Sequence, residues 1–377
     1  MKNEIKICHL TSAHSALDDR IFFKECVSLA KVNFDVYIVA PNSEEQYING
    51  VHIISFPFRK NRLKRFIFLS RYILKMALKI NADIYHLHDP DLLACGYYLK
   101  KKGKVVIFDS HEDVPKQILS KDWIFKPFRL LISKLYREYE KNILARFDGL
   151  ITVNESIATR LLKINSNTII ITNYPLLTEM NLFKVGLFTK ENAICFGGNI
   201  KKEYMHHLIL DAISEIKGVK YYLAGNVSQD YFNVLKNRAG WRNVKYLGFL
   251  ERTRLFEVYS KSMIGIAVHD YTPNVGGKEG SLGFIKNFEF MMAGLPVICT
   301  DFKVWKEIIE KEKRGICVNP TDKDEIKNAI QYLLTNPEVA CWMGRNGRKA
   351  IENKYNWETQ VPILIDFYNN LCVKLNK

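Results

Sequence analysis

Strand and helix signals alternate along nearly the whole of this chain. Short runs rich in Val, Ile and aromatic residues are separated by longer segments with helical periodicity. We expect strands at residues 5–10, 34–40, 51–56, 83–88, 104–110, 149–153, 168–172, 192–198, 219–225, 244–249, 263–268, 295–300 and 315–318. Parallel strands need a crossover that a helix supplies, so this alternation is typical of parallel sheets covered by helices. The sequence therefore predicts an α/β protein.

The length of the chain, 377 residues, exceeds what one ordinary hydrophobic core supports, so we expect two α/β domains in succession. The predicted first domain covers residues 1–175, a linker covers 176–190, and the second domain covers 191–355. The final segment, 356–377, is expected to form a helix that packs back on the first domain.

Composition excludes several classes of protein. Hydrophobic residues make up 47% and charged residues 25% of the chain, which is close to globular averages. No apolar run reaches the roughly 18 residues of a membrane span, and the start lacks a signal-peptide pattern. The eight cysteines form no C-x-x-C pair, so we expect buried reduced thiols. These features predict a cytoplasmic protein.

The net charge of +15 indicates an anionic partner. Arg59–Lys79 carries eight basic residues and no acidic one, with apolar residues at roughly helical spacing. Such a helix can lie peripherally on the anionic inner face of the cytoplasmic membrane, although a domain helix with a solvated charged face has the same pattern. Lys121–Arg137 repeats the mixture. Without a zinc-finger, RRM or helix-turn-helix pattern, we expect no nucleic-acid partner.

Polar residues follow many of the predicted strands, where open α/β sheets bind their ligands. These residues are His14, His88, Asp89, His111, Glu112, Gly198, Asn199, His269 and Asp270. Any one of them alone is more often a capping or core residue. So many histidines at strand ends together favour a ligand site.

A glycine-bearing loop, residues 280–283, precedes an expected helix at 284–293, with Gly294 as its left-handed cap. The loop contains Ser281 and Gly283, and its free backbone N–H groups at the helix start would suit a phosphate. On this helix Lys286 and Glu289 lie on one side. A carboxylate there can accept hydrogen bonds from ribose hydroxyls, and a lysine can meet phosphate oxygens. A surface Lys–Glu pair on an amphipathic helix has the same pattern.

The segment KNFEFMMAGLPVICTDFKVWKEII resembles the signature of family-4 (group 1) retaining glycosyltransferases. Stretches similar to bacterial polysaccharide-biosynthesis members are ICHLTSAHSALDDRIFFKECVSLAK, YHLHDPDLL, FDSHEDVPKQIL, and LAGN followed by VKYLGFL. The resemblance implies the GT-B fold, in which two Rossmann-like domains face each other across a cleft. It also implies a UDP- or GDP-linked sugar held by the C-terminal domain and an acceptor held by the N-terminal domain.

The resemblance assigns donor-binding roles to several residues. Glu289 matches the second glutamate of the family's E-x7-E motif, which meets the donor ribose. Ser281 stands where the first glutamate belongs, so its hydroxyl or the loop amides would hold the sugar. Asn199, next to Gly198, and Tyr204 replace the family's basic pair. Charge on the diphosphate would then come from Lys201, Lys202 or Lys286, and Gly248 falls where the backbone approaches the base.

His111 matches the family's histidine near the reacting centre and is the predicted catalytic residue. The resemblance implies no protein nucleophile: the leaving phosphate helps deprotonate the acceptor on the same face of the sugar, while the protein supplies positioning and electrostatic stabilisation. His14, Arg20 and His88 are expected on the acceptor side. For Arg20, an ion pair with Asp18, Asp19 or Glu25 is an equal alternative.

His86 and His88, two residues apart on a predicted strand, point the same way, as zinc ligands do. Third and fourth ligands are not evident in the sequence, and GT-B enzymes generally use no bound metal. We therefore predict no metal site and no cofactor beyond the nucleotide sugar.

The sequence thus predicts a metal-independent, hexosyltransferase-type enzyme. It would move a sugar onto a lipid-linked or growing cell-surface glycan, such as an O-antigen, capsule or exopolysaccharide. Two alternatives stay open. A sugar-nucleotide epimerase shares the two-domain fold. A non-catalytic glycosyltransferase-like binding partner is suggested by Ser281 and by the missing basic pair.

Overall fold

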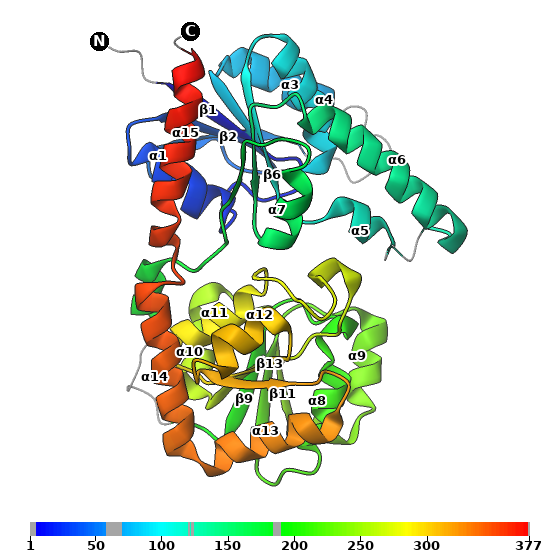
Figure 1. Ribbon diagram of the computed structural model, residues 1–377. Helices are drawn as coiled ribbons and strands as arrows, with labels where there is room; N and C mark the ends of the chain where they lie inside the picture. Colours follow the sequence, from blue (N-terminus) through cyan, green and yellow to red (C-terminus); the bar gives the residue numbers. More distant parts are fainter. Residues whose placement is uncertain (1–4, 58–69, 120, 122–123, 184–189, 376–377) are drawn as a thin grey trace. The chain divides into compact units, whose positions relative to one another are not determined.

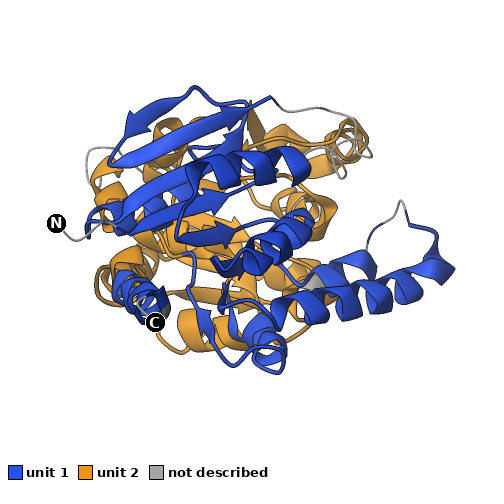
Figure 2. Ribbon diagram, turned by 90° about the horizontal axis from the view of Figure 1, so that it is seen from above, with its two compact units in different colours: residues 1–173, 359–377 blue, residues 174–358 orange. Residues whose placement is uncertain are grey.

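The computed structural model describes residues 5–57, 70–119, 121, 124–183 and 190–375 (Figure 1). The chain divides into two compact units, coloured separately in Figure 2. Unit 1 comprises Met1–Asn173 and Thr359–Lys377, and unit 2 comprises Tyr174–Glu358. Each unit contains one sheet, and the predicted α/β fold with two largely parallel sheets is confirmed.

The sheet of unit 1 has eight strands in the order β3-β4-β2-β1-β5-β6-β7-β8. Their bounds are β1 Lys6–Leu10, β2 Asp35–Pro41, β3 Gln46–Ile48, β4 Val51–Phe56, β5 Ile84–Leu87, β6 Val105–Ser110, β7 Gly149–Thr152 and β8 Thr168–Ile170. Only the β3–β4 pair is antiparallel within this sheet. Every strand predicted for this half is present.

Among the described strands, only β3 was not predicted. It is short and pairs with β4 through a turn in which Asn49 has φ 51° and Gly50 has φ 82°. Consecutive left-handed residues of type Asn-Gly form the tight turn that joins two antiparallel strands. The Asn-Gly pair in the sequence was therefore a usable signal.

Helices cover the sheet of unit 1. A π-helical turn, Ile21–Cys26, leads into α1 (Val27–Ala30), and the longer helices are α3 (Ser70–Ile80), α4 (Leu93–Lys101), α5 (Val114–Leu119), α6 (Lys126–Leu144), α7 (Glu155–Leu161) and α15 (Val361–Leu375). The last of these, α15, belongs to unit 1 although it comes from the end of the chain. Its Tyr368 is fully buried, and the hydroxyl lies 2.8 Å from Nδ1 of His86 on β5.

The sheet of unit 2 has six parallel strands in the order β11-β10-β9-β12-β13-β14. They are β9 Ala193–Gly197, β10 Lys220–Ala224, β11 Val244–Gly248, β12 Ile264–Ala267, β13 Val297–Thr300 and β14 Gly315–Val318. The helices are α8 His206–Ile213, α9 Gln229–Lys236, α10 Arg252–Lys261, α11 Ile285–Met292, α12 Lys303–Trp305, α13 Lys323–Thr335 and α14 Pro337–Asn353. All strands predicted for this half are present. The strand order reverses at β9 and β12, where open α/β sheets bind ligands.

Part of the predicted linker is packed into unit 2. Met180 and Phe183 are buried in the hydrophobic core of that unit, as is Tyr174 just before the linker. A 3₁₀-helical segment spans Leu177–Leu182. Residues 184–189 of the same linker lie outside the described residues. Apolar side chains at these positions explain why the segment folds onto the core instead of bridging through solvent.

The described helices bear on the predicted membrane contact of Arg59–Lys79 and on the predicted absence of a membrane span. Residues 59–69 of the basic stretch Arg59–Lys79 lie outside the described residues. In the described part, α3 buries Ile73 and Ala77 in the core of unit 1, so its apolar face is that of a domain helix. No helix in the described ranges is long and apolar enough to span a bilayer.

The eight cysteines, all within the described residues, form no disulfide, and most of them are buried.

Candidate functional site

Three neighbouring strands of unit 2 end in glycines with positive φ. These are Gly198 after β9 (φ 148°), Gly225 after β10 (134°) and Gly248 at the end of β11 (64°). A Cβ atom on Gly225 would lie 1.7 Å from the carbonyl oxygen of Gly198, which leaves no room for a side chain. The amide of Gly225 donates to the carbonyl of Gly248 at 2.6 Å. This edge of the sheet is therefore built of closely packed backbone, which allows a ligand to approach the main chain.

Glu289 lies on α11, and its carboxylate is almost fully buried. Oε2 accepts hydrogen bonds from Nζ of Lys286 at 3.0 Å and from the hydroxyl of Tyr259 at 3.3 Å, while Oε1 accepts from Nη1 of Arg252 at 3.3 Å. Burial alone would raise the pKa of Glu289, but Lys286 and Arg252 hold it below its ordinary value. The carboxylate is therefore ionised at neutral pH.

The Lys286–Glu289 pair is thus not a surface pair, which was one interpretation of its spacing. Lys286 also reaches the glycine-rich edge: a Cβ atom on Gly198 would lie 2.9 Å from Cε of Lys286 and 3.7 Å from Nζ. The ammonium group of Lys286 therefore lies close to Gly198 at the end of β9 and beside the buried carboxylate of Glu289. The role of Glu289 towards a ribose stays a prediction.

Arg252 and Tyr259 were missed by the sequence analysis. Both lie on α10, and Arg252 also binds Glu179, with Nη2 at 2.8 Å from Oε2. Arg252 follows β11 at the same sheet edge as the glycines, so the rule that ligands gather at strand ends was a signal for it. Tyr259 contacts Glu289 because α10 packs on α11. No pattern in the sequence predicts this packing.

The loop before α11 differs in one respect from the prediction. The amide of Gly283, expected to be free for a phosphate, donates to Oγ of Ser281 at 3.1 Å. The carbonyl of Ser281 in turn accepts from Nε1 of Trp305 at 3.0 Å. After the helix, Gly294 has φ 69°, as predicted for its cap. Asn199 and Lys202 are exposed beyond the end of β9.

In unit 1, His111 follows β6, and its side chain is 20% exposed. Its Nε2 lies 3.0 Å from Oδ2 of Asp109, which is fully buried on β6. Burial would raise the pKa of Asp109, but Arg20 and then His111 hold it well below its usual range. An ionised aspartate therefore fixes the orientation of the His111 ring. Asp109 was not predicted as a site residue, although it lies two residues before His111 in the segment FDSH.

His14 and His88 lie beside His111. The ring centroids of His14 and His111 are 5.5 Å apart, and those of His88 and His111 are 5.6 Å apart. His14 is partly exposed, and Asp18 raises its pKa through a hydrogen bond. His88 is buried beneath this surface. The structure thus brings the predicted catalytic histidine together with two of the predicted acceptor-side residues.

Arg20 is buried and forms ion pairs with Glu25 and Asp109. Its Nε lies 3.0 Å from Oε1 of Glu25, and Nη2 lies 2.9 Å from Oδ2 of Asp109. Nη1 donates to the carbonyl of Ile171 at 2.9 Å. The pair with Glu25 is the alternative that the sequence left open. Because Nε, Nη1 and Nη2 of Arg20 all have protein partners, the guanidinium fixes the position of the Asp109 carboxylate. A contact of Arg20 with an acceptor stays a prediction.

Each unit thus supplies a distinct chemistry. The edge of unit 2 combines closely packed backbone with the cations Lys286 and Arg252 around a buried carboxylate, which suits an anionic ligand that also carries hydroxyl groups. The edge of unit 1 offers an oriented, partly exposed imidazole. Neither arrangement places a Ser or Cys nucleophile in a triad with these histidines among the described contacts.

Comparisons with known proteins agree with these features. The family description "Glycosyltransferase Family 4" matches residues 24–173, and "Glycosyl transferases group 1" matches residues 178–350. An uncharacterized glycosyltransferase of Methanocaldococcus jannaschii is 26% identical over 189 residues, which cover 49% of this chain and 46% of that protein. The match thus spans about half the length of this curated relative.

Two solved structures show the fold. Sucrose-phosphate synthase from Thermosynechococcus elongatus superposes with a TM-score of 0.76 at 17% identity, covering 98% of this chain and 100% of the other. Alr3699/HepE of Anabaena, in complex with UDP and glucose, gives a TM-score of 0.70 at 14% identity, with 97% and 100% covered. The two family descriptions follow one another along the chain as the two sheets do, and the chain belongs to the group 1 glycosyltransferases of the GT-B fold.

Proposed function

We propose that this protein is a retaining glycosyltransferase that moves a sugar from a nucleotide-sugar donor to a lipid-linked or growing cell-surface glycan. The observation that carries the proposal is the ionised, buried Glu289 between Lys286 and Arg252, beside the glycine-lined edge of the unit 2 sheet. A nucleotide sugar has the matching parts. Its ribose offers hydroxyl donors, and its diphosphate offers negative charge.

The hydrogen bonds of Glu289 leave capacity for a ribose. Among the described residues, Oε1 accepts one hydrogen bond, whereas a carboxylate oxygen can accept two. Lys286 stands over Gly198 and can turn its remaining donors towards a phosphate oxygen. Lys202 adds an exposed positive charge four residues after Gly198 in the sequence. Side-chain cations of this kind can balance a leaving diphosphate, which supports transfer without a metal at the donor.

The reaction would proceed on one face of the sugar. The bond between C1 and the donor phosphate oxygen breaks, and the acceptor oxygen forms the new bond to C1 from the same side. The acceptor proton passes to the departing phosphate oxygen. His111, oriented by Asp109, would contact the sugar near C1 and stabilise developing charge, and His14 would lie towards the acceptor.

A panel of nucleotide sugars tests the donor. We expect one UDP- or GDP-sugar, present at about 100 times its Kd, to stabilise the protein by about 2.7 kcal/mol and raise Tm by roughly 5–10 °C. Differential scanning fluorimetry with UDP-, GDP- and dTDP-sugars measures this shift. ATP at equal concentration controls for general anion binding. The absence of a selective shift with any sugar nucleotide would contradict the proposed donor site.

A non-catalytic binding partner is the second candidate, because Asn199 and Tyr204 stand where the family carries its basic pair. An assay with radiolabelled donor and a lipid acceptor separates the possibilities. A transferase labels the lipid, a sugar-nucleotide epimerase converts the free nucleotide sugar alone, and a binding partner does neither. Labelled lipid product is the outcome that supports our proposal.

For the acceptor, we infer that unit 1 docks on an anionic membrane through α6. One side of this helix carries exposed apolar side chains that recur at helical spacing, here called the apolar seam: Phe128, Leu131, Ile132, Leu135 and Tyr139. Phe128 and Leu135 are 55% and 63% exposed. The opposite side of α6 already packs on the unit, where Ser133 and Glu140 are buried. The seam is therefore an additional apolar surface that the core does not use.

Basic residues accompany the seam. Along α6 they are Lys126, Arg129, Lys134, Arg137 and Lys141, against acidic Glu138 and Glu140. Glu140 is buried and paired with Arg160. An apolar strip flanked by lysine and arginine matches the boundary between acyl chains and anionic headgroups. The membrane contact predicted for Arg59–Lys79 stays a prediction, because residues 59–69 lie outside the described residues. We propose α6 as an additional membrane contact, since its apolar seam is exposed.

Replacing Phe128, Leu131 and Leu135 together with serine should weaken binding to vesicles of phosphatidylglycerol and phosphatidylcholine by roughly 100-fold. Each substitution then removes about 1 kcal/mol of binding free energy, because the apolar side chain is no longer partly buried in the bilayer surface. Vesicle co-sedimentation measures the change. The matched control replaces Val234, Tyr332 and Trp342, exposed apolar residues of unit 2, and should bind as the wild type does. Equal binding by both triple variants would contradict the docking role.

A further inference from the structure

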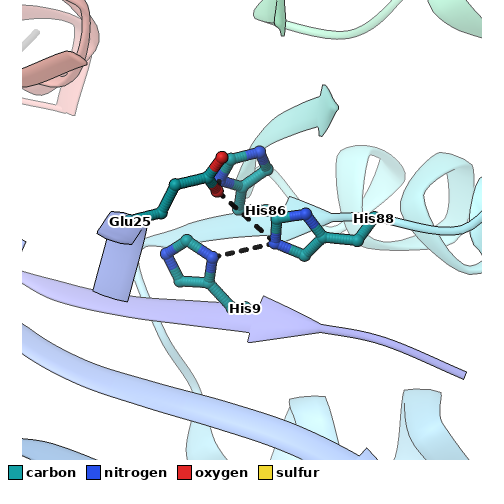
Figure 3. Close-up of side chains that lie close together, drawn as sticks. All are labelled: His9, Glu25, His86 and His88. Carbon is teal, nitrogen blue, oxygen red and sulfur yellow. Dashed lines mark hydrogen bonds and ion pairs between the residues drawn. The ribbon is translucent and has the colours of Figure 1, made fainter. Parts of the chain in front are cut away.

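Four side chains able to ligate a metal meet in the core of unit 1 (Figure 3). They are His9 on β1, Glu25 on the π-helical turn, His86 on β5, and His88 directly after β5. Each offers one ligand atom, and these four atoms all lie within 4.8 Å of one another. Third and fourth ligands for His86 and His88 were not evident in the sequence. In the structure, His9 and Glu25 lie close enough to serve as these ligands.

Sheet geometry explains the meeting. β1 and β5 are parallel neighbours in which His9 pairs with His86 in register. Side chains alternate between the two faces of a strand, so His86 and the residue two positions on, His88, share the face of His9. Glu25 reaches the same face from the turn that follows β1 in sequence, as Figure 3 shows. The register between β1 and β5 was not readable from the sequence.

The distances suit a small cation. Nδ1 of His9 lies 2.9 Å from Nε2 of His88. Oε2 of Glu25 lies 3.8 Å from Nδ1 of His86 and 3.9 Å from Nε2 of His88. Zinc with bonds of about 2.0–2.1 Å in tetrahedral geometry separates its ligand atoms by about 3.4 Å. The observed separations of ligand atoms lie on both sides of that value. Side-chain shifts below about 1 Å would therefore place the four ligand atoms at the corners of a tetrahedron around the ion.

The cluster has more buried polar atoms than partners. His9, Glu25 and His86 are fully buried, and His88 nearly so. Within the described residues, Nε2 of His9, Nε2 of His86 and both carboxylate oxygens of Glu25 make no hydrogen bond, although Arg20 pairs with Oε1. A buried polar group without a hydrogen bond destabilises the folded state, because it has lost its water partners. A cation bound through Nδ1 of His9 and of His86, the nitrogens nearest the other ligands, would satisfy the Glu25 carboxylate. It would leave Nε2 of these two rings as they are.

A carboxylate next to the cluster also favours a cation. Nδ1 of His88 lies 3.7 Å from Oδ2 of Asp109, in the position of the carboxylate that commonly supports a ligating histidine.

Two neighbours limit how the ion can bind. Arg20 brings a positive charge to Glu25, but Asp109 pairs with the same guanidinium and offsets it. Nδ1 of His86 lies 2.8 Å from the hydroxyl of Tyr368, so ligation through this nitrogen would replace that hydrogen bond. The site is closed to solvent, as structural zinc sites are, whereas catalytic sites keep an open position.

We propose that His9, Glu25, His86 and His88 bind one zinc-like divalent transition ion with a structural role in unit 1. The ion would join β1, β5 and the π-helical turn, and one of its ligands, His88, lies beside His111. The proposed ligands all belong to unit 1, whereas the proposed donor-binding residues belong to unit 2. The inference is independent of the proposed glycosyl transfer and is tested by metal content.

The first measurement is the zinc content of protein purified from zinc-supplemented cells without a histidine tag. Mass spectrometry of the metal should find about one equivalent per chain in the wild type. Glu25→Gln preserves shape but removes the carboxylate, and it should lower zinc to less than about a tenth of an equivalent, as should His86→Gln. The matched control is His206→Gln. His206 lies in unit 2, is also fully buried, and is hydrogen-bonded to the hydroxyl of Tyr221. It should retain zinc.

A second measurement covers variants that fail to fold. Chelator-treated wild type should regain its original Tm on adding Zn²⁺, and Co²⁺ should produce the visible absorption of a tetrahedral site. Wild type that contains no zinc, and whose Tm and absorption do not respond to either ion, overturns the proposal. So does Glu25→Gln protein that folds and keeps a full equivalent.

Discussion

Replacing His111 with alanine is expected to lower kcat by roughly 100- to 1000-fold, the usual effect of removing one group that stabilises transition-state charge. The fold should lose only about 1 kcal/mol. His111 is partly exposed, and within the described part of the chain its side chain makes one hydrogen bond, to Asp109. That carboxylate keeps its ion pair with Arg20 in the variant. Turnover and stability should therefore separate.

The measurement is steady-state transfer from labelled donor, alongside urea unfolding of the same preparations. His52→Ala is the control: His52 is also a partly exposed histidine of unit 1, stacked on Tyr37 at 4.5 Å, away from the site. Its turnover should equal that of the wild type. If His111→Ala loses stability and activity in equal proportion, His111 is a structural residue and its catalytic assignment is wrong.

Glu289→Ala should weaken binding of the nucleotide sugar by roughly 10- to 100-fold, since a hydrogen bond to a charged group is worth about 1.5–3 kcal/mol. It should also lower the free energy of unfolding by about 1–3 kcal/mol. Removing one partner of a fully buried ion pair costs about 3–5 kcal/mol. The loss should be smaller here because Arg252 keeps Glu179 as a partner and Lys286 is partly exposed.

The two effects of Glu289→Ala can be separated with a matched variant. Glu140 is a fully buried glutamate of unit 1 that pairs with Arg160. Glu140→Ala should destabilise the protein to a similar degree and leave nucleotide affinity unchanged. Isothermal titration with the donor found in the thermal-shift panel gives both affinities. Unchanged affinity in Glu289→Ala would remove the ribose role of Glu289 and leave its ion pairs as purely structural.

Much of the fold could be predicted because it rests on local signals. Runs of β-branched residues marked every strand except β3, and glycine marked the end of α11 at Gly294. The linker was harder to predict. Met180 and Phe183 are separated by Asn181 and the exposed Leu182, and only the core of unit 2 shows which of the apolar residues are buried there.

The site could be predicted only where its parts are close in sequence. Lys286 and Glu289 are one helical turn apart, so their pairing was readable, and it is observed. Arg252 reaches Glu289 from another helix, and His9 reaches His88 from another strand. These contacts depend on strand register and helix packing, which periodicity does not specify.

The basic helices illustrate a limit of pattern reading. An apolar stripe with lysines beside it has the same sequence whether the stripe faces a sheet or a lipid surface. In α3, Ile73 and Ala77 face the core, whereas in α6 the stripe from Phe128 to Tyr139 is exposed. Only the position of each helix on unit 1 distinguishes the two cases.

The placement of α15 has a consequence for biosynthesis. Unit 1 is discontinuous in sequence: Tyr368 fills its interior beside His86, and Gln360 accepts a hydrogen bond from the amide of Thr172. A ribosome releases residues 1–173 first and must then translate all of unit 2 before α15 emerges. Nascent unit 1 therefore waits with an uncovered apolar surface while unit 2 folds, a period in which chaperones would be needed most.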